Sequence, residues 1–180
     1  MKNRHCAQRL AAALLLAAAF LVLGACANSS GAKNKTEYGA TIVRIRPDYR
    51  TAESFDRISE YFTGAENTGG EIVLRTHPET RAGFYFFTRL KVRDDITIAD
   101  AQIEISVITP ASPEAKTFLL RVPVALRKGT VLLNPGLTGP DWPWTGADAN
   151  ARPVAWRVRL LHASGAVLAS AQSYLWSKSP

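Results

Sequence analysis

Residues 84–93, with the sequence FYFFTRLKVR, contain the strongest two-residue periodicity in the chain. One face of a strand built from them would carry Phe84, Phe86, Thr88, Leu90 and Val92, and the other face Tyr85, Phe87, Arg89, Lys91 and Arg93. Alternation of this kind is typical of a strand that buries one face of a sheet. The stretch therefore predicts a strand at the centre of a β fold.

Extended patterns continue on both sides of this stretch. Residues 101–107 alternate in the same way, and further strands are predicted over 42–46, 71–76, 117–122, 130–133, 154–161 and 166–175. The turn 162–165 ends in Ser164-Gly165, which favours a hairpin. A long loop is expected over 134–153. The pattern predicts an all-β fold, an antiparallel two-sheet sandwich of immunoglobulin-like or fibronectin-like architecture without their cysteine pair.

One short helix is expected near residues 52–62. Thr51 can cap its start, Glu53 lies in the first turn and Gly64 can close its end. Phe55, Ile58 and Phe62 recur at helical spacing. We expect these three side chains to pack the helix onto the sheet.

The N-terminal residues have the three parts of a secretory signal. Lys2, Arg4 and Arg9 are basic, residues 10–23 contain no polar group, and Gly24-Ala25 are small. The run from Leu10 to Ala27 also approaches the roughly 18 residues that span a bilayer, so an uncleaved anchor is the alternative.

A cysteine follows directly, and Leu23-Gly24-Ala25-Cys26 resembles the lipobox of bacterial lipoprotein precursors. The resemblance implies that residues 1–25 form a signal peptide that is removed and that Cys26 is the lipid attachment site. It also implies a lipid-anchored protein of the bacterial cell envelope, and Ala27 suits the outer membrane, with the chain facing the periplasm. Residues 26–37 then form a flexible tether, and residues 38–176 a single domain.

The net charge argues against a nucleic-acid partner. The whole chain carries +7, but three bases and no acid lie within residues 1–25, so the remainder has 19 bases, 15 acids and a charge of +4. Nucleic acid would need a basic stripe interleaved with stacking aromatics in a compartment that contains it, whereas an exported lipoprotein first meets anionic lipid or cell-wall polymer. Several arginines occupy alternate strand positions, such as Arg44 and Arg46, which a solvated strand face or an anion site would both explain.

No motif for catalysis or for a cofactor is recognisable. The sequence lacks a nucleophile elbow, paired metal-ligand histidines and a glycine-rich phosphate loop, and we expect neither an enzyme nor a metal site. A hydrolase of unrecognised type is the weakest alternative. Asp94, Asp95 and Asp100 suit a turn, although calcium also binds such clusters.

The segment 138–146 carries the candidate ligand-binding residues Asp141, Trp142 and Trp144. Two tryptophans held by prolines resemble the aromatic surfaces that stack on sugars or extended peptides. The alternative is that one or both rings plug the open end of the sandwich.

These observations predict a membrane-anchored envelope lipoprotein that acts as a non-catalytic interaction or structural module with a protein partner. A carbohydrate-binding module that uses Trp142 and Trp144 for a cell-wall or surface glycan is the alternative.

Overall fold

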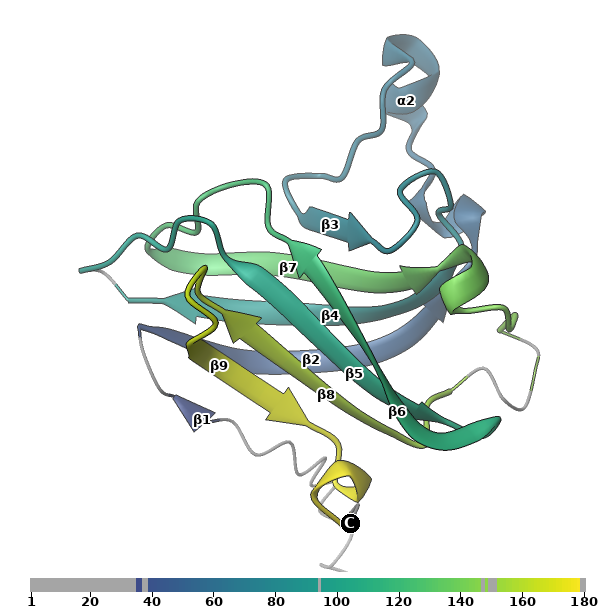
Figure 1. Ribbon diagram of the computed structural model, residues 1–180. Coiled ribbons are helices and arrows are strands. Elements are labelled where there is room, and N and C mark those ends of the chain that lie inside the picture. Colours follow the sequence, from purple (N-terminus) through teal and green to yellow (C-terminus); the bar gives the residue numbers. More distant parts are fainter. Residues whose placement is uncertain (1–34, 37–38, 94, 147, 149–151, 179–180) are drawn as a thin grey trace, which may run out of the picture. The chain divides into compact units, whose positions relative to one another are not determined.

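Two stacked sheets form the fold (Figure 1). The computed structural model describes residues 35–36, 39–93, 95–146, 148 and 152–178. Sheet A has the order β1(Lys35–Thr36), β9(Val167–Gln172), β8(Ala155–Leu161), β5(Gln102–Thr109), β6(Ser112–Arg121). Sheet B has the order β2(Ala40–Arg50), β4(Gly83–Val92), β7(Gly129–Thr138), β3(Ile72–Arg75). The predicted all-β sandwich is confirmed, and the described pairs are antiparallel except for the parallel β3–β7 pair.

Strand β4 lies between β2 and β7, as the amphipathic stretch 84–93 predicts. All five residues of the predicted inner face are buried, and Phe86 and Leu90 have no exposed surface. They pack in one core with residues of sheet A, among them Ile103, Ile105, Val158 and Leu160. Because one face of each sheet is apolar, stacking the two faces removes both from water.

The C-terminal hairpin joins β8 and β9 through the turn that Gly165 makes possible. Gly165 has φ 83°, a backbone conformation that suits glycine, and its N–H donates to the carbonyl of His162 at 2.8 Å. The turn fixes the register in which Val158 faces Ala171. Short 3₁₀ turns follow β7 and β9, at Gly139–Asp141 and Leu175–Lys178.

The predicted loop 134–153 begins too early. Strand β7 continues through Asn134 and Pro135 to Thr138, because the parallel strand β3 pairs with this half of it. Pairing with β4 stops between Leu133 and Gly136, where Pro135 has no N–H to donate. This extension brings Asn134 of β7 to Glu71, at the end of the segment that links β2 to β3, where the Asn134 amide donates to the Glu71 carboxylate at 2.6 Å.

The predicted helix is divided in two. A 3₁₀ turn covers Ala52–Phe55 and helix α2 covers Ile58–Thr63, with extended backbone at Asp56 and Arg57 between them. Thr51 makes no side-chain cap. The interruption turns α2 away from the direction of the first turn, which decides which side chains reach the sheet.

Candidate interaction site

The segment between β2 and β3, residues 51–71, leaves sheet B and carries α2 away from the strands (Figure 1). We call it the excursion. Ile58, Tyr61 and Phe62 of α2 are 78%, 85% and 85% exposed, and we call these three residues the α2 tip. The prediction that Ile58 and Phe62 pack onto the sheet is therefore wrong. Positions i, i+3 and i+4 share one helix face, so the tip is a single apolar surface.

Helix α2 has a defined end but few local contacts to stabilise it. Gly64 adopts φ 67°, and its N–H donates to the carbonyl of Glu60 at 2.8 Å. Asn67 accepts from Gly69 N–H at 2.9 Å and donates to Ser59 Oγ at 2.7 Å. A six-residue helix with no buried side chain is not stable alone, so its position depends on the rest of the excursion.

Phe55 is the apolar anchor of the excursion. Its ring centre lies 4.8 Å from that of Tyr85 on the outer face of β4, and the Arg75 guanidinium lies 5.3 Å from the Phe55 ring. The prediction that Phe55 packs onto the sheet is confirmed. Phe55 covers Tyr85, a residue of the predicted outer face that has no exposed surface.

Arg75 on β3 joins the excursion to the sheet by charge. Its guanidinium makes two hydrogen bonds to the Glu66 carboxylate, and Arg75 Nε donates to the Tyr85 hydroxyl at 2.9 Å. That hydroxyl in turn donates to the carbonyl of Arg81 at 2.6 Å. Two-point pairing of this kind holds both partners in one orientation.

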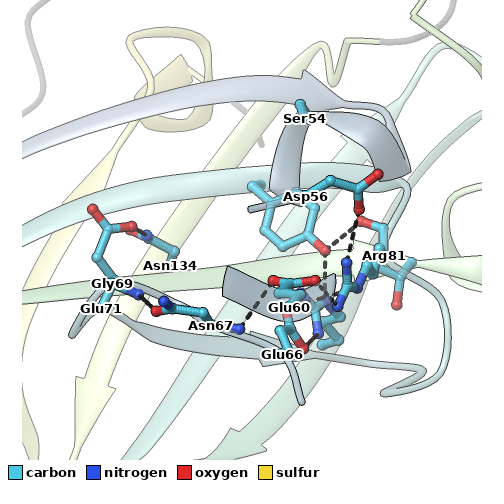
Figure 2. A network of polar contacts seen from close by, with 12 residues as sticks. Ser54, Asp56, Glu60, Glu66, Asn67, Gly69, Glu71, Arg81 and Asn134 are labelled. Atoms are coloured by element: carbon cyan, nitrogen blue, oxygen red, sulfur yellow. Dashed lines mark hydrogen bonds and ion pairs between the residues drawn. The ribbon is translucent and has the colours of Figure 1, made fainter. Parts of the chain in front are cut away.

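Arg81, just before β4, holds the other side of the excursion (Figure 2). Its guanidinium donates to Asp56 Oδ1 at 2.9 Å and lies 2.8 Å from Glu60 Oε2. The other carboxylate oxygen of Glu60 accepts the Asn67 N–H at 2.9 Å. Figure 2 shows these side chains converging beneath α2. We call the contacts of Arg75 and Arg81 with the excursion the brace.

The brace shifts the ionisation of its members. Hydrogen bonds from Arg75 lower the pKa of Glu66, and the backbone N–H of Asn67, with Arg81, lowers the pKa of Glu60. Burial raises the pKa of Tyr85, so its phenol stays protonated and can donate. Glu60 and Glu66 are therefore charged at neutral pH.

The segment 138–146 is arranged differently from the excursion. Trp142 is 3% exposed, and its ring centre lies 4.8 Å from that of Phe84 and 4.9 Å from that of Trp144. Trp144 is half-buried against the core. The Trp142 ring thus plugs one end of the sandwich and offers no open face for stacking on a sugar.

Asp141 is held by a neighbouring turn. Its Oδ2 lies 3.2 Å from Nε2 of His77, and the His77 N–H donates to Thr138 Oγ1 at 2.9 Å. The structure thus brings Trp142 and Trp144 together, while the Asp141 side chain pairs with His77. The ligand-binding role predicted for Asp141, Trp142 and Trp144 remains untested, and the burial of Trp142 removes the stacking surface that suggested it.

The remaining predicted positions are not assembled into a site. Asp95 pairs with Arg93 and Asp100 with Arg121, while Asp94 lies outside the described residues. No cluster of three or more metal-binding side chains occurs among the residues that the structure describes. The signal cleavage residues Leu23, Gly24 and Ala25 and the lipid attachment residue Cys26 also lie outside the described part of the chain.

The sequence analysis missed Tyr61 and the brace. One signal for the brace was present. Apart from its final residue, Glu71, the excursion contains one base, Arg57, and the acids Glu53, Asp56, Glu60 and Glu66. Such an excess of acid indicates basic partners elsewhere in the chain. Nothing in the sequence identified Arg75 and Arg81 as those partners.

Comparisons add no relative. No known family model matches the sequence, and no characterised protein aligns with it significantly. Within the described ranges, no helix has the length and apolar character needed to cross a membrane.

Proposed function

We propose that this chain is a membrane-anchored lipoprotein of the bacterial envelope that works as a non-catalytic interaction module, and that the α2 tip contacts its protein partner. The observation that carries the proposal is the exposure of Ile58, Tyr61 and Phe62 on a helix that the brace holds in place. The chemistry of the tip suits contact, since its exposed surface consists of one aliphatic and two aromatic side chains.

Exposure of three large apolar side chains on one helix face is unfavourable in water. Contiguous apolar surface on a soluble domain marks contact with another molecule. An aromatic anchor in the middle of an interface supplies much of the binding free energy, and Tyr61 is the residue type enriched there. The tip therefore supports a role as the anchor of a larger interface.

The brace supports the same role through entropy. A loop that must be ordered on binding lowers the affinity, and side chains already fixed in place avoid that loss. Arg75 and Arg81 connect the excursion to β3 and β4 from two sides. We infer that α2 is presented in its binding position before the partner arrives.

The anchor part of the proposal is supported by the lipobox Leu23-Gly24-Ala25-Cys26 and by the basic and apolar residues before it. Two or more acyl chains hold a protein stably at a membrane. The location proposed is the periplasmic side of the outer membrane. Labelling cells with an alkyne fatty acid should tag the full chain, and Cys26→Ala should abolish the tag; labelling that persists in Cys26→Ala refutes the anchor.

Site-specific crosslinking tests the contact. A photoreactive phenylalanine at position 61 of the full chain, produced in its own cells, should yield one discrete crosslinked product. The same residue at the exposed position Lys116 on β6 is the matched control and should not yield that product. Adding Ile58→Ser and Phe62→Ser should remove the product. Equal crosslinking at positions 61 and 116, or none at 61, contradicts the proposal.

A further inference from the structure

The outer face of sheet B carries arginines that lack carboxylate partners. Arg44 on β2 lies opposite Arg89 on β4, and Arg46 lies opposite Phe87. Arg44, Arg46 and Arg89 are exposed, and none of the described carboxylates is within ion-pair distance of them. Like charges directly opposite each other destabilise a sheet. A solvated face would leave this repulsion in place, whereas an anionic ligand bound between the arginines would offset it.

Sheet A offers a comparison, because two of its arginines share a carboxylate partner. On β8, Arg159 lies 2.7 Å and Arg157 lies 3.7 Å from the carboxylate of Glu104 on the neighbouring strand β5. Hydrogen bonds from Arg159 lower the pKa of Glu104, so the carboxylate is charged at neutral pH. Sheet B has no equivalent of Glu104 between Arg44 and Arg89.

The acids near the outer face of sheet B are already engaged. Glu66, Glu60 and Asp56 belong to the brace, and Glu71 accepts a hydrogen bond from Asn134 at 2.6 Å. Asp48 lies 3.5 Å from Arg50. The Asn134 amide is neutral, and Glu71 lines the same groove as Arg44, Arg46 and Arg89. Three arginines against one carboxylate still leave this part of the groove with an excess of basic side chains.

A groove runs over Phe87 between these arginines and the excursion. One part is basic and is lined by Arg44, Arg46, Arg89 and Leu132. The next part shares Phe87 and Glu71 and has mixed charge, with Arg50, Arg57, Val73, Asp56 and Glu66 in its lining. The guanidinium carbons of Arg46 and Arg50 lie 5.4 Å and 5.0 Å from the centre of the Phe87 ring. The ring orients both planar cations, and Nε of Arg50 is buried without a hydrogen-bond partner among the described residues.

The spacing of the charges selects an extended occupant. The backbones of Arg44 and Arg46 are two residues apart on one strand, about 6.7 Å at the usual rise. A peptide in extended conformation repeats its side chains at the same interval. The guanidinium groups of Arg46 and Arg50 both lie beside the Phe87 ring. Apolar surface of Phe87, Leu132 and Val73 separates the charges. Phosphate polymers and lipid headgroups would leave that surface unused.

We propose that this groove binds an extended, acidic peptide segment of the partner protein, with carboxylates on Arg44, Arg46 and Arg89 and an apolar side chain against Phe87. The inference rests on the proposed function, since it names the chemistry of the partner. It uses a different surface from the α2 tip, so crosslinking at position 61 and binding in the groove can fail independently.

Fluorescence anisotropy of a labelled peptide tests this inference. The probe is the nonapeptide DSDSLSDSD, which in extended form places aspartates and one leucine on one face at the arginine spacing. The Kd is measured on the full chain in detergent. The purified chain without residues 1–37 is measured in parallel, only as a check on solubility. Binding should weaken with added salt, and Arg46→Gln with Arg89→Gln should raise the Kd roughly three- to tenfold, the range expected for losing two exposed ion pairs.

Controls separate the outcomes. Arg127→Gln, at an exposed arginine outside the groove, removes one charge, as Arg46→Gln and Arg89→Gln each do when made singly, and should leave the Kd unchanged. The nonapeptide with asparagine in place of aspartate should not bind. Equal weakening by Arg127→Gln and by the groove variants overturns the inference, because it indicates a general charge effect. Absence of binding, or binding of phosphatidylglycerol vesicles that depends on Arg46 and Arg89 and displaces the peptide, also overturns it.

Discussion

Two aromatic regions of this protein differ sharply in how much of their surface is exposed to solvent. The segment 138–146 has its tryptophans between prolines in a polar loop, yet Trp142 is 3% exposed. The excursion has aromatic residues at helical spacing, yet Tyr61 and Phe62 are each 85% exposed. Apolar character is similar in the two, so the difference must come from what lies next to each in the fold.

Neighbouring structure accounts for the contrast. The end of β7 carries Trp142 directly over Phe84, where the open end of the sandwich offers apolar surface. In the excursion Phe55 occupies the available surface on Tyr85, and the break at Asp56 and Arg57 turns α2 outward. Exposure is thus decided by which apolar surface remains free, a property of the whole fold.

Truncation of the buried tryptophan should have the largest effect. Trp142→Ala should lower the free energy of unfolding by about 3–5 kcal/mol, because it removes a large ring from the core and leaves a cavity. Urea denaturation followed by circular dichroism measures the change. A loss below about 1 kcal/mol would contradict the burial of Trp142 and would restore the possibility that it binds a ligand.

The brace should show an intermediate effect with a pH signature. Arg75→Gln should cost about 1 kcal/mol, since the pair with Glu66 is partly screened by solvent, and should raise the pKa of Glu66 toward its ordinary value. Because Arg75 lowers the pKa of Glu66 in the folded state, the stabilisation is present above the ordinary glutamate pKa. It is lost as the pH falls through the lowered value.

Carboxyl-carbon NMR titration of the wild type and Arg75→Gln measures both shifts. Glu104, whose pKa is lowered by Arg159 on the other sheet, provides the internal control and should titrate identically in both proteins. A Glu66 titration that does not respond to Arg75→Gln means that the brace does not form in solution.

The smallest change in stability should come from the α2 tip. Tyr61→Ser and Phe62→Ser should each change the free energy of unfolding by less than about 0.5 kcal/mol, as substitutions at exposed positions do. Differential scanning calorimetry alongside Trp142→Ala sharpens the comparison between the two regions. A loss comparable to that of Trp142→Ala would mean that α2 packs onto the sheet, as its sequence pattern predicts.

The sequence predicted the elements governed by local alternation. The faces of 84–93 and the hairpin around Gly165 required only the period of two and one turn residue. The extension of β7 through Pro135 was missed because a parallel pair with β3 joins residues about sixty positions apart. Contacts at such separation leave no local signature.

The candidate site was predictable only in part. Helical spacing located α2 and Gly64 marked its end, since both are local properties. The brace joins Glu66 to Arg75 and Asp56 to Arg81, which lie on opposite sides of the reversal of the chain between the excursion and sheet B. The exposure of Tyr61 depends on a second non-local fact, that Phe55 covers the available surface on the sheet. The lipobox remains a prediction that rests on the sequence Leu23-Gly24-Ala25-Cys26.

Strand β2 leads directly from the N-terminal side of the domain into the excursion. Under the proposed function, with a lipid anchor at Cys26 and a partner on α2, tension would pass through β1 and β2 and then into the excursion. The 11 residues of β2 are already extended, close to the maximum reach of a chain, so the strand can lengthen very little under load. Strand β1 of sheet A would come first in that line of force, and β2 would follow it as a short, nearly inextensible link to the partner.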